Sequence, residues 1–250
     1  MNLDCNGVPT GSYIVTGAGG NSTDYNFSNG MTTNTDGVFT MLAAGNYIVT
    51  ISEQANPMCA SVCNVAITEP ESLTCVATLN ADVSCNGLSD GSATVVAAGG
   101  TALYTYAWDN GETTATATML NAATHTVTVT DANGCATICE VIVSENPPVT
   151  CTATVDAHVS CNGASDGSLV IGATGGDGVY EYDLDGTLLQ TFGVFGGLPA
   201  GSYTLTLSDA NGCSSTCTAT ITEPAVLSCS TVTSTAVSYT HLTLPTTPYV

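Results

Sequence analysis

The stretch DVSCNGLSDGSATV (Asp82–Val95) recurs 76 positions later as HVSCNGASDGSLVI (His158–Ile171) and, less closely, as DCNGVPTGSYIV (Asp4–Val15). Each copy is followed by a Gly-Gly pair and, where the repeat ends, by a short proline-containing segment, TEP or SENPP. A sequence that matches itself at a fixed period of this length is typical of an array of small domains. The chain is therefore predicted to be a tandem repeat protein.

The same repeat predicts the domain boundaries. Its linkers are short and contain proline, which makes them semi-rigid spacers. The final residues, VSYTHLTLPTTPYV with His241 among them, break the pattern and read as a translated sequencing adapter, so we expect an unstructured artefact there. The predicted segments are a first repeat at 1–72 that lacks its beginning, a second at 73–148, a third at 149–225, the start of a fourth at 226–236, and the adapter residues at 237–250.

Within each repeat the hydrophobic pattern is that of β-strands. Tyr104, Tyr106 and Trp108 alternate with other residues, and the following Asp109–Gly111 is a hairpin turn signal. Similar alternating runs give about six or seven strands per repeat, with turns every 8–12 residues or so, which is typical of an immunoglobulin-like sandwich. We predict an all-β chain of tandem Ig-like β-sandwich repeats, each about 76–80 residues long.

One motif predicts a specific side-chain bond. LPAGSYTLTLSD at Leu198–Asp209 parallels LAAGNYIVTISE at Leu42–Glu53. In an Ig-like fold the tyrosine of this motif is expected to be a corner tyrosine, whose hydroxyl bonds back to the backbone a few residues upstream. The second repeat has His125 at this position.

The charge balance excludes several functions. The chain has 21 acidic residues and no Lys or Arg, for a net charge of −21. Nothing can neutralise phosphates, so nucleic-acid binding and attraction to anionic lipid are not expected. We also expect no salt bridge. The charge favours solubility, and the lack of Lys and Arg removes every site for trypsin-like proteases.

The cysteines indicate an oxidising compartment. There are 12 Cys, no CxxC pair, and too few His to complete zinc sites. Disulfides in an extracellular or cell-surface protein are therefore expected. The N-terminus MNLDCNGVPT has no signal-peptide pattern, so we expect the natural N-terminus to lie upstream. No apolar run is long enough to predict membrane insertion.

The words CNGxSDGS, LxAGxYxVxVxDxNGC and TEP resemble the SprB-type repeat over nearly all of 3–224. The resemblance implies a large surface adhesin of gliding or biofilm-forming Bacteroidota, exported by type IX secretion, with tandem Ig-like domains. It also implies two cysteines per repeat, which match Cys85 and Cys135. The additional pair, Cys75 and Cys139, departs from that pattern.

Four cysteines per repeat allow three connectivities. We favour bonds inside each repeat, which leave Cys63 and Cys229 without partners. An alternative joins neighbouring repeats through Cys63–Cys75, Cys139–Cys151 and Cys217–Cys229, but each bond would require the chain to fold back within twelve residues. The favoured pairs are Cys5–Cys59, Cys85–Cys135, Cys75–Cys139, Cys161–Cys213 and Cys151–Cys217.

No catalytic motif is present. The chain has no GxSxG, HExxH or P-loop. His125 replaces a repeated Tyr and His158 replaces Asp82, so both are interpreted as packing or surface residues. We predict that the chain is not an enzyme and needs no cofactor.

Calcium is the chemical alternative, because the turns carry many oxygen ligands. The interpretation we favour is that Asp and Asn before Gly bond their own backbone in turns. The calcium candidates are Asp90, Asp131, Asp166, Asp209, Asp183 and Asp185.

The predicted function is that of a structural and adhesive repeat segment in a secreted bacterial surface protein. Its predicted partners are the neighbouring repeats and an extracellular polysaccharide or surface ligand. A second hypothesis is a calcium-dependent carbohydrate-binding module, in which Tyr104 or Tyr180 would stack on sugars. A third is an accessory domain of a secreted hydrolase.

Overall fold

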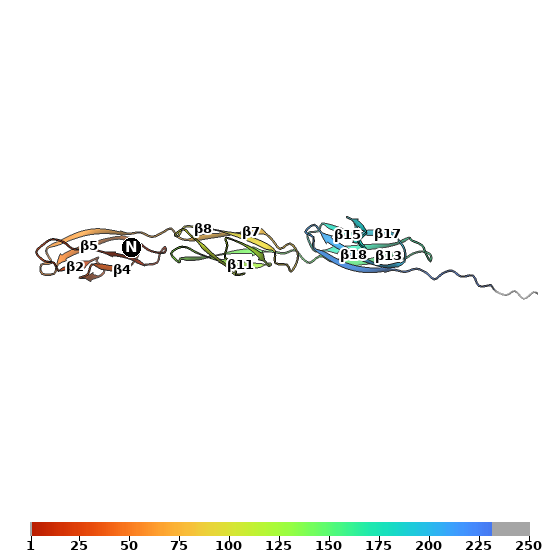
Figure 1. The fold of residues 1–250 in the computed structure, drawn as a ribbon, viewed down its shortest axis with the longest axis horizontal. Coiled ribbons are helices and arrows are strands. Elements are labelled where there is room, and N and C mark those ends of the chain that lie inside the picture. The colour runs from red at the N-terminus through yellow and green to blue at the C-terminus, as the bar shows by residue number, and fades with distance from the viewer. Residues whose placement is uncertain (1, 232–250) are drawn as a thin grey trace, which may run out of the picture. The chain divides into compact units, whose positions relative to one another are not determined.

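The computed structural model describes residues 2–231, which contain β-strands and no helix (Figure 1). No segment of this part forms a helix able to cross a membrane. The predicted adapter residues 237–250, and positions 232–236 of the predicted fourth repeat, lie outside the described residues. Residues 226–231 are described and belong to no strand.

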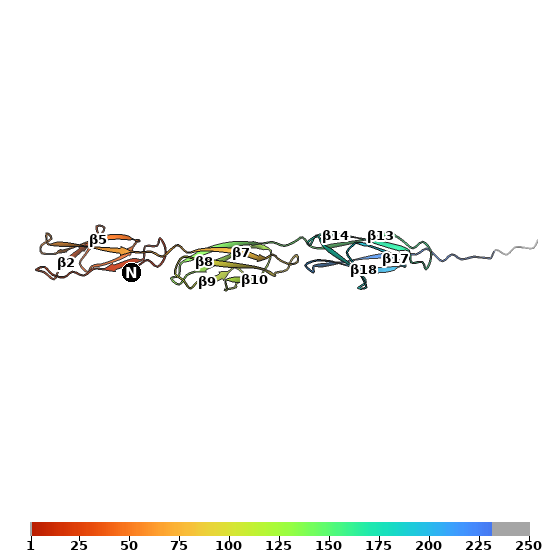
Figure 2. The ribbon, with the colours of Figure 1, turned by 90° about the horizontal axis from the view of Figure 1, so that it is seen from above.

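The second repeat shows the domain architecture most completely. β7 and β8 run side by side in both views (Figure 1, Figure 2) and form one sheet in the order β10-β8-β7. The other sheet has the order β12-β11-β9. These orders correspond to strands A-B-E and C-F-G of an immunoglobulin sandwich. The strands are β7 (Thr74–Ala81), β8 (Gly91–Ala98), β9 (Thr105–Trp108), β10 (Thr116–Leu120), β11 (Ala123–Thr130) and β12 (Ala136–Val143).

The third repeat has the same arrangement with one additional short strand. Its sheets have the orders β13-β14-β17 and β16-β15-β18-β19. Here β16 extends the second sheet through a hairpin with β15. The strands are β13 (Thr150–Ala157), β14 (Gly167–Thr174), β15 (Tyr180–Leu184), β16 (Leu188–Gln190), β17 (Val194–Leu198), β18 (Gly201–Asp209) and β19 (Ser214–Ile221).

The first repeat has a narrower first sheet. It consists of β1 and β4 only, and the second sheet has the order β3-β2-β5-β6. Among the described residues, no strand takes the place that β7 and β13 have in the other repeats. The strands are β1 (Gly11–Ile14), β2 (Tyr25–Ser28), β3 (Thr33–Asn34), β4 (Val38–Leu42), β5 (Gly45–Glu53) and β6 (Ala60–Ile67).

Strand alternation builds three hydrophobic cores, each inside one sequence repeat. In β11, Val127 and Val129 are fully buried, whereas the threonines between them are not. β18 buries Leu205 and Leu207 in the same way. The tandem all-β sandwich fold predicted from the sequence is therefore present.

Contacts divide the chain into two compact units. The first comprises 1–150, 174–180 and 208–215, and the second comprises 151–173, 181–207 and the residues from 216 onward. The turns of the third repeat at 174–180 and 208–215 thus belong to the first unit. The repeat boundaries at 72, 148 and 225 remain predictions.

The corner residues bond as the motif indicates. The Tyr47 hydroxyl donates to the Ala43 carbonyl at 2.9 Å, and the Tyr203 hydroxyl donates to the Pro199 carbonyl at 2.8 Å. In the second repeat, His125 Nε2 lies 3.0 Å from the Asn121 carbonyl, four residues upstream as in the tyrosine corners. Histidine therefore replaces the tyrosine without losing the bond.

The buried Leu120 allows a test of the second core. It is fully buried in the cluster that contains Trp108, the only tryptophan of the chain. Leu120→Ala should lower the free energy of unfolding by about 2–5 kcal/mol, because the substitution leaves a cavity. Trp108 fluorescence during urea unfolding reports on this repeat alone.

The matched control is Leu88→Ala in the same repeat, which removes a side chain that is 48% exposed and should cost about 0.5 kcal/mol or less. Equal losses would contradict the assignment of the core.

Candidate functional site at the repeat junctions

The CNG loop, residues 5–7, 85–87 or 161–163, is anchored to the end of its own repeat. In every repeat its glycine N–H donates to the glutamate carboxylate of the segment that follows the last strand. We call 68–70, 144–146 and 222–224 the exit segments. The three bonds are Gly7 to Glu69 at 2.8 Å, Gly87 to Glu145 at 2.7 Å and Gly163 to Glu223 at 2.8 Å.

The asparagine and the glycine of the CNG loop contribute to the anchoring in different ways. The glycines adopt φ between +74° and +79°, a left-handed conformation that glycine reaches without steric cost. Each asparagine side chain donates to an exit-segment carbonyl. These bonds are Asn6 to Pro70, Asn86 to Asn146 and Asn162 to Pro224. The distant words CNG and TEP therefore recur together because they bond each other.

The opposite end of the repeat is a turn organised by a buried aspartate. Asp131 accepts hydrogen bonds from the N–H groups of Thr101, Asn133 and Cys135 at 2.9 Å each. These bonds, that from Thr101 first among them, lower the pKa of Asp131 below its ordinary value. Asp209 makes the equivalent bonds in the third repeat, to Asn211 and Cys213. We call Cys59, Cys135 and Cys213, which follow this turn, the turn cysteines.

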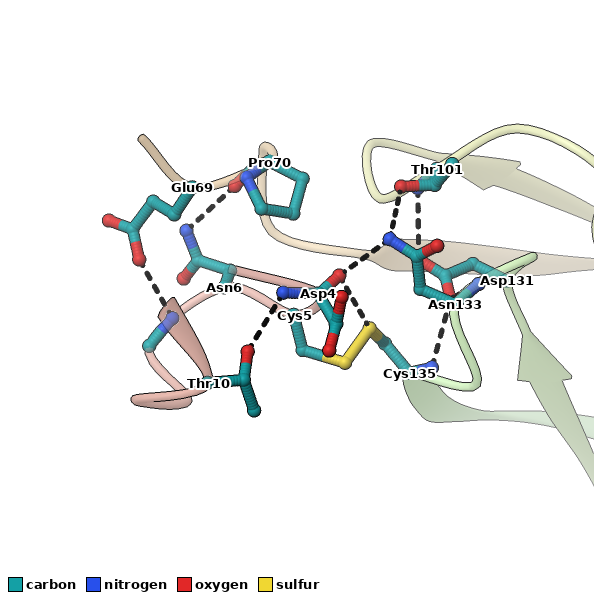
Figure 3. The surroundings of a disulfide bond; sticks show 11 residues. Asp4, Cys5, Asn6, Thr10, Glu69, Pro70, Thr101, Asp131, Asn133 and Cys135 are labelled. Carbon is teal, nitrogen blue, oxygen red and sulfur yellow. Dashed lines mark hydrogen bonds between the residues drawn. A yellow bond between two sulfur atoms is a disulfide. The ribbon is translucent and has the colours of Figure 1, made fainter. Parts of the chain in front are cut away.

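A disulfide joins the CNG loop of the first repeat to the turn of the second (Figure 3). Cys5 and Cys135 are bonded with a Cα–Cα distance of 5.7 Å. Beside the bond, the Asn133 side chain donates to the Asp4 carbonyl at 2.8 Å and to the Thr101 hydroxyl at 2.9 Å. The first and second repeats are therefore joined by a disulfide and by hydrogen bonds, in addition to the linker between them.

The next junction repeats this connection. Cys85, in the CNG loop of the second repeat, is bonded to the turn cysteine Cys213, with a Cα–Cα distance of 5.5 Å. The sequence separation is 128 residues, against 130 for Cys5–Cys135. The rule at both junctions is the same: the CNG cysteine of one repeat bonds to the turn cysteine of the following repeat.

Three of the pairs predicted from the sequence are wrong. The structure contains no Cys5–Cys59, Cys85–Cys135 or Cys161–Cys213 bond; Cys59 and Cys161 are free.

The physical reason is strand length. In the second repeat the eight-residue β12 runs from the turn to the exit segment beside the CNG loop. Eight residues in a strand span about 26 Å, whereas disulfide Cα atoms lie within about 7 Å. The length of β12 therefore excludes a Cys85–Cys135 bond. The strands β6 and β19 also have eight residues, and they exclude Cys5–Cys59 and Cys161–Cys213 in the same way.

The remaining bonds lie inside repeats. Cys75–Cys139 and Cys151–Cys217 form as predicted, with Cα–Cα distances of 6.0 and 5.6 Å. Each joins the first strand of a repeat to its last strand. The alternative set Cys63–Cys75, Cys139–Cys151 and Cys217–Cys229 does not form. Cys63 and Cys229 are free, as the favoured pairing requires.

Five of the six calcium candidates accept hydrogen bonds from backbone N–H groups. Besides Asp131 and Asp209, Asp90 accepts from Ser84 and Asp166 from Ser160, and these serine contacts lower the pKa of both carboxyls. Asp185 accepts the N–H of Thr204 at 2.7 Å. Asp183 lies in β15 opposite Leu189. Within residues 2–231, no three His, Cys, Asp or Glu side chains are grouped so that they could hold a metal ion.

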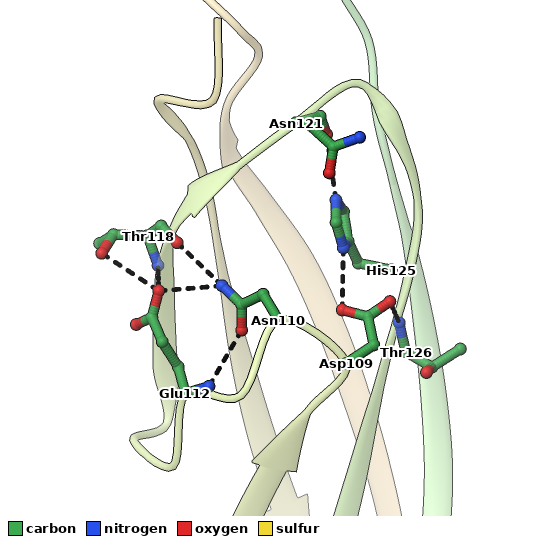
Figure 4. Close-up of polar contacts among 7 residues, drawn as sticks. All are labelled: Asp109, Asn110, Glu112, Thr118, Asn121, His125 and Thr126. Atoms are coloured by element: carbon green, nitrogen blue, oxygen red, sulfur yellow. Dashed lines mark hydrogen bonds and ion pairs between the residues drawn. The ribbon is translucent and has the colours of Figure 1, made fainter.

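His125 forms an ion pair that the sequence analysis missed (Figure 4). Its Nδ1 lies 2.9 Å from Asp109 Oδ1, and its Nε2 lies 3.0 Å from the Asn121 carbonyl. Both partners are acceptors, so both ring nitrogens must carry a proton for both bonds to form. The expectation of no salt bridge is therefore wrong, because it considered only Lys and Arg.

Burial and bonding act on the pKa of His125 in opposite directions. Burial lowers it, but the hydrogen bonds to Asp109 and Asn121 outweigh burial and raise the pKa above its ordinary value. For Asp109, burial raises the pKa, and the bonds from His125 and the Thr126 N–H lower it overall. The pair therefore supports the charged forms of both groups.

The other candidate residues have structural contacts. His158 Nδ1 accepts the N–H of Thr222 at 3.1 Å, as Asp82 accepts that of Ser144 at 2.7 Å. The Tyr104 and Tyr180 hydroxyls donate to the carbonyls of Gly99 and Gly175, and both rings are half-buried. The hydroxyls of both tyrosines are therefore held within their own repeats, and the Tyr104 ring packs against the core of the second repeat.

Comparisons with known proteins identify the repeat. A family model described as SprB repeat matches residues 77–113 and 152–187. No curated protein sequence matches the chain.

Several solved structures are similar. Three N-terminal domains of the bacteriophage RB49 highly immunogenic outer capsid protein are 14% identical over 90% of this chain and 97% of that chain, with a TM-score of 0.38. The N-terminal eight Ig domains of the Down syndrome cell adhesion molecule are 10% identical over 87% of this chain, with a TM-score of 0.36. The chain spans about a third (34%) of the length of that molecule. Cadherin domains 1–4 of protocadherin gamma B7 are 14% identical over 85% of this chain and 71% of that chain, with a TM-score of 0.29.

The ion pair predicts a pH dependence of the second repeat. Because the folded pKa of His125 is raised, its stabilisation is complete below about pH 6.5, the unfolded value, and is lost as pH rises through the folded pKa. The free energy of unfolding, measured by Trp108 fluorescence in urea with the free thiols alkylated, should fall by about 1 kcal/mol toward alkaline pH. His125→Tyr, which restores the residue of the other repeats, should remove this dependence. An unchanged pH profile in that variant would contradict the role of His125.

Proposed function

Because this chain is a SprB-type repeat protein, we propose that it is a structural segment of a cell-surface adhesion protein, built to transmit tension without unfolding. The observation that carries this proposal is the order of the disulfides along the chain. The resemblance to SprB repeats supports export by type IX secretion in a member of the Bacteroidota, and a role in adhesion, gliding or a biofilm stalk. The disulfides support an extracellular location.

The disulfides shorten the covalent path along which a pulling force acts. From residue 2 to residue 231 the shortest path has stretches of 3, 16 and 14 residue steps, joined by Cys5–Cys135 and Cys151–Cys217. Fully extended, these stretches measure roughly 110–120 Å, whereas the whole described chain would measure roughly 760–820 Å. Most residues of the three cores lie inside the bypassed loops and carry no tension. The buried core residues on the shortest path itself are Leu3, Val141, Val143 and Ile221.

The composition supports the same function. A net charge of −21 limits association between neighbouring molecules. The absence of Lys and Arg denies cleavage sites to trypsin-like proteases outside the cell. Both properties suit a long exposed spacer. The partners we propose are the neighbouring repeats and, for the complete protein, an extracellular polysaccharide or surface ligand.

Single-molecule stretching tests the tension path, because the two junction disulfides contribute unequally to it. Removing Cys5–Cys135 with Cys5→Ser and Cys135→Ser lengthens the shortest path from 33 to 99 residue steps. The maximum extension should grow by roughly 220–240 Å.

The matched control is Cys85→Ser with Cys213→Ser, which removes a disulfide outside the shortest path. Its maximum extension should equal that of the unsubstituted oxidised chain. Full reduction with dithiothreitol should release both variants to the same length. An oxidised chain that lengthens by hundreds of ångströms without substitution would refute the proposed function.

We further propose that the fold needs no calcium, since five of the six carboxylates considered as ligands already accept backbone N–H groups. The melting temperature of the oxidised chain should be equal in millimolar calcium and in excess chelator, measured by circular dichroism. A chain with Asp131→Asn is the control for a lost turn contact, and it should melt lower in both conditions. A calcium-dependent rise in melting temperature would instead favour the carbohydrate-binding alternative.

A further inference from the structure

Seven Asn-Gly pairs occur in the sequence. In such a pair the asparagine side chain can react with the amide nitrogen of the glycine, which no side chain shields. The reaction requires the carboxamide to turn toward that nitrogen, so hydrogen bonds that hold the carboxamide elsewhere slow it. The contacts of each asparagine therefore decide which pairs react.

Six of the seven carboxamides are held by hydrogen bonds. The three asparagines of the CNG loops donate to exit-segment carbonyls. Asn29 accepts two N–H groups of its own turn, and Asn110 donates to a carboxylate and a carbonyl beside its hairpin. Asn133 donates to the Asp4 carbonyl and to the Thr101 hydroxyl (Figure 3). None of these six side chains is free to turn.

Asn211 is the exception. Among residues 2–231, no group shares a hydrogen bond with its carboxamide, although its backbone N–H donates to Asp209 at 3.0 Å. Asn211 lines a cavity of about 320 Å³ together with Ser84 and Glu145, among others. Its side chain therefore has both the freedom and the space to turn.

The turn of the second repeat is a matched comparison. Both turns have the sequence DANGC, at Asp131–Cys135 and at Asp209–Cys213. Their glycines have similar φ angles, +87° and +84°, and the glycine N–H groups donate to the carbonyls of the turn aspartates at 3.1 and 3.0 Å. Local sequence and backbone therefore do not distinguish Asn133 from Asn211.

One neighbouring residue does distinguish them. Thr101 donates its N–H to Asp131, and its hydroxyl accepts from the Asn133 carboxamide. The third repeat has Asp177 at the equivalent position, since the Asp177 N–H donates to Asp209. Asp177 has no hydroxyl, and its carboxylate accepts a backbone N–H two residues onward. The contact that holds Asn133 within its own repeat is therefore missing at Asn211.

We propose that Asn211 deamidates spontaneously, and faster than the other six asparagines of this kind. The Gly212 nitrogen attacks Cγ of Asn211 and gives up its proton, and the carboxamide nitrogen leaves with that proton as ammonia. Water then opens the cyclic imide at either of its carbonyls. The product is aspartate or, where the main chain now runs through the former side chain, isoaspartate. One water is taken up and one ammonia is released, so no oxidant is needed.

The modification changes the junction that Cys213 closes. The new carboxylate shares its cavity with Asp82 and Glu145, and the chain has no Lys or Arg to offset the added charge. Like charges at short range repel each other. Isoaspartate also lengthens the main chain by one carbon, two residues before Cys213, which is bonded to Cys85. The connection between the second and third repeats therefore changes with the age of the molecule.

Peptide mapping of the aged chain tests the proposal. The oxidised chain is incubated at mildly alkaline pH, then reduced, alkylated and cut with a Glu-specific protease. Asn133 and Asn211 fall in separate peptides, 113–140 and 182–223, and mass spectrometry gives the converted fraction of each. Asn211 should convert about fivefold faster or more, the factor that corresponds to one net hydrogen bond.

The unfolded chain is the internal control. In urea with a reductant, Asn133 and Asn211 should convert at equal rates, because both lie in DANGC. Equal rates in the folded chain would overturn the proposal. Unequal rates in urea would overturn it too, since the difference would then not come from the fold.

Reciprocal substitutions test the cause. Asp177→Thr supplies the hydroxyl that Asn211 lacks and should slow its conversion about fivefold. Thr101→Asp removes that hydroxyl from Asn133 and should speed its conversion. Each variant carries a residue that the same position of the other repeat already has, so both should fold, as circular dichroism can check. Asp177→Ala removes the carboxylate without adding a hydroxyl and should leave Asn211 fast. An unchanged rate at Asn211 in Asp177→Thr would refute the assigned cause.

Discussion

The length of one β-strand determines how the cysteines of this chain pair. β12 places the turn with Cys135 about 26 Å from the CNG loop of the same repeat. A disulfide cannot bridge that distance, so each of these cysteines finds its partner in a neighbouring repeat. Cys75 and Cys139 lie near each other on the first and last strands and bond within their repeat. Two kinds of disulfide, within and between repeats, therefore follow from one sandwich geometry.

The absence of Lys and Arg changes what the acidic residues do. In most proteins carboxylates meet cationic side chains, but here they accept backbone N–H groups at the points where the chain turns. The Glu145 carboxylate accepts the N–H of Gly87. The Asp131 carboxylate accepts the N–H of Thr101 and, within its own turn, the N–H of Asn133. Charge-assisted hydrogen bonds of this type are stronger than neutral ones. Acidic residues thus fix the two ends of each sandwich, while the disulfides fix the repeats to each other.

The sequence predicts local features well and long-range pairing less well. Strand alternation, the corner bond of Tyr203 and the Cys75–Cys139 disulfide follow from periodicity and motif, and the structure contains them. The inter-repeat disulfides were missed because residue spacing does not show which end of a sandwich a loop occupies. The His125–Asp109 pair was missed because a lone histidine gives no pattern at all. Placing each cysteine relative to the strand that follows it would have excluded the wrong pairs.

The bonds between repeats also impose an order on biosynthesis. When a chain emerges with its N-terminus first, the first repeat can fold while Cys5 still has no partner, because Cys135 has not yet been exposed. The same delay applies to Cys85, which must wait for Cys213. Oxidation of these pairs therefore lags one domain behind synthesis, and the CNG cysteine of the most recently folded domain stays a thiol until the next domain has folded. An oxidase acting on this chain would meet these cysteine pairs in sequence, so the junctions are bonded in the order in which the domains fold along the chain.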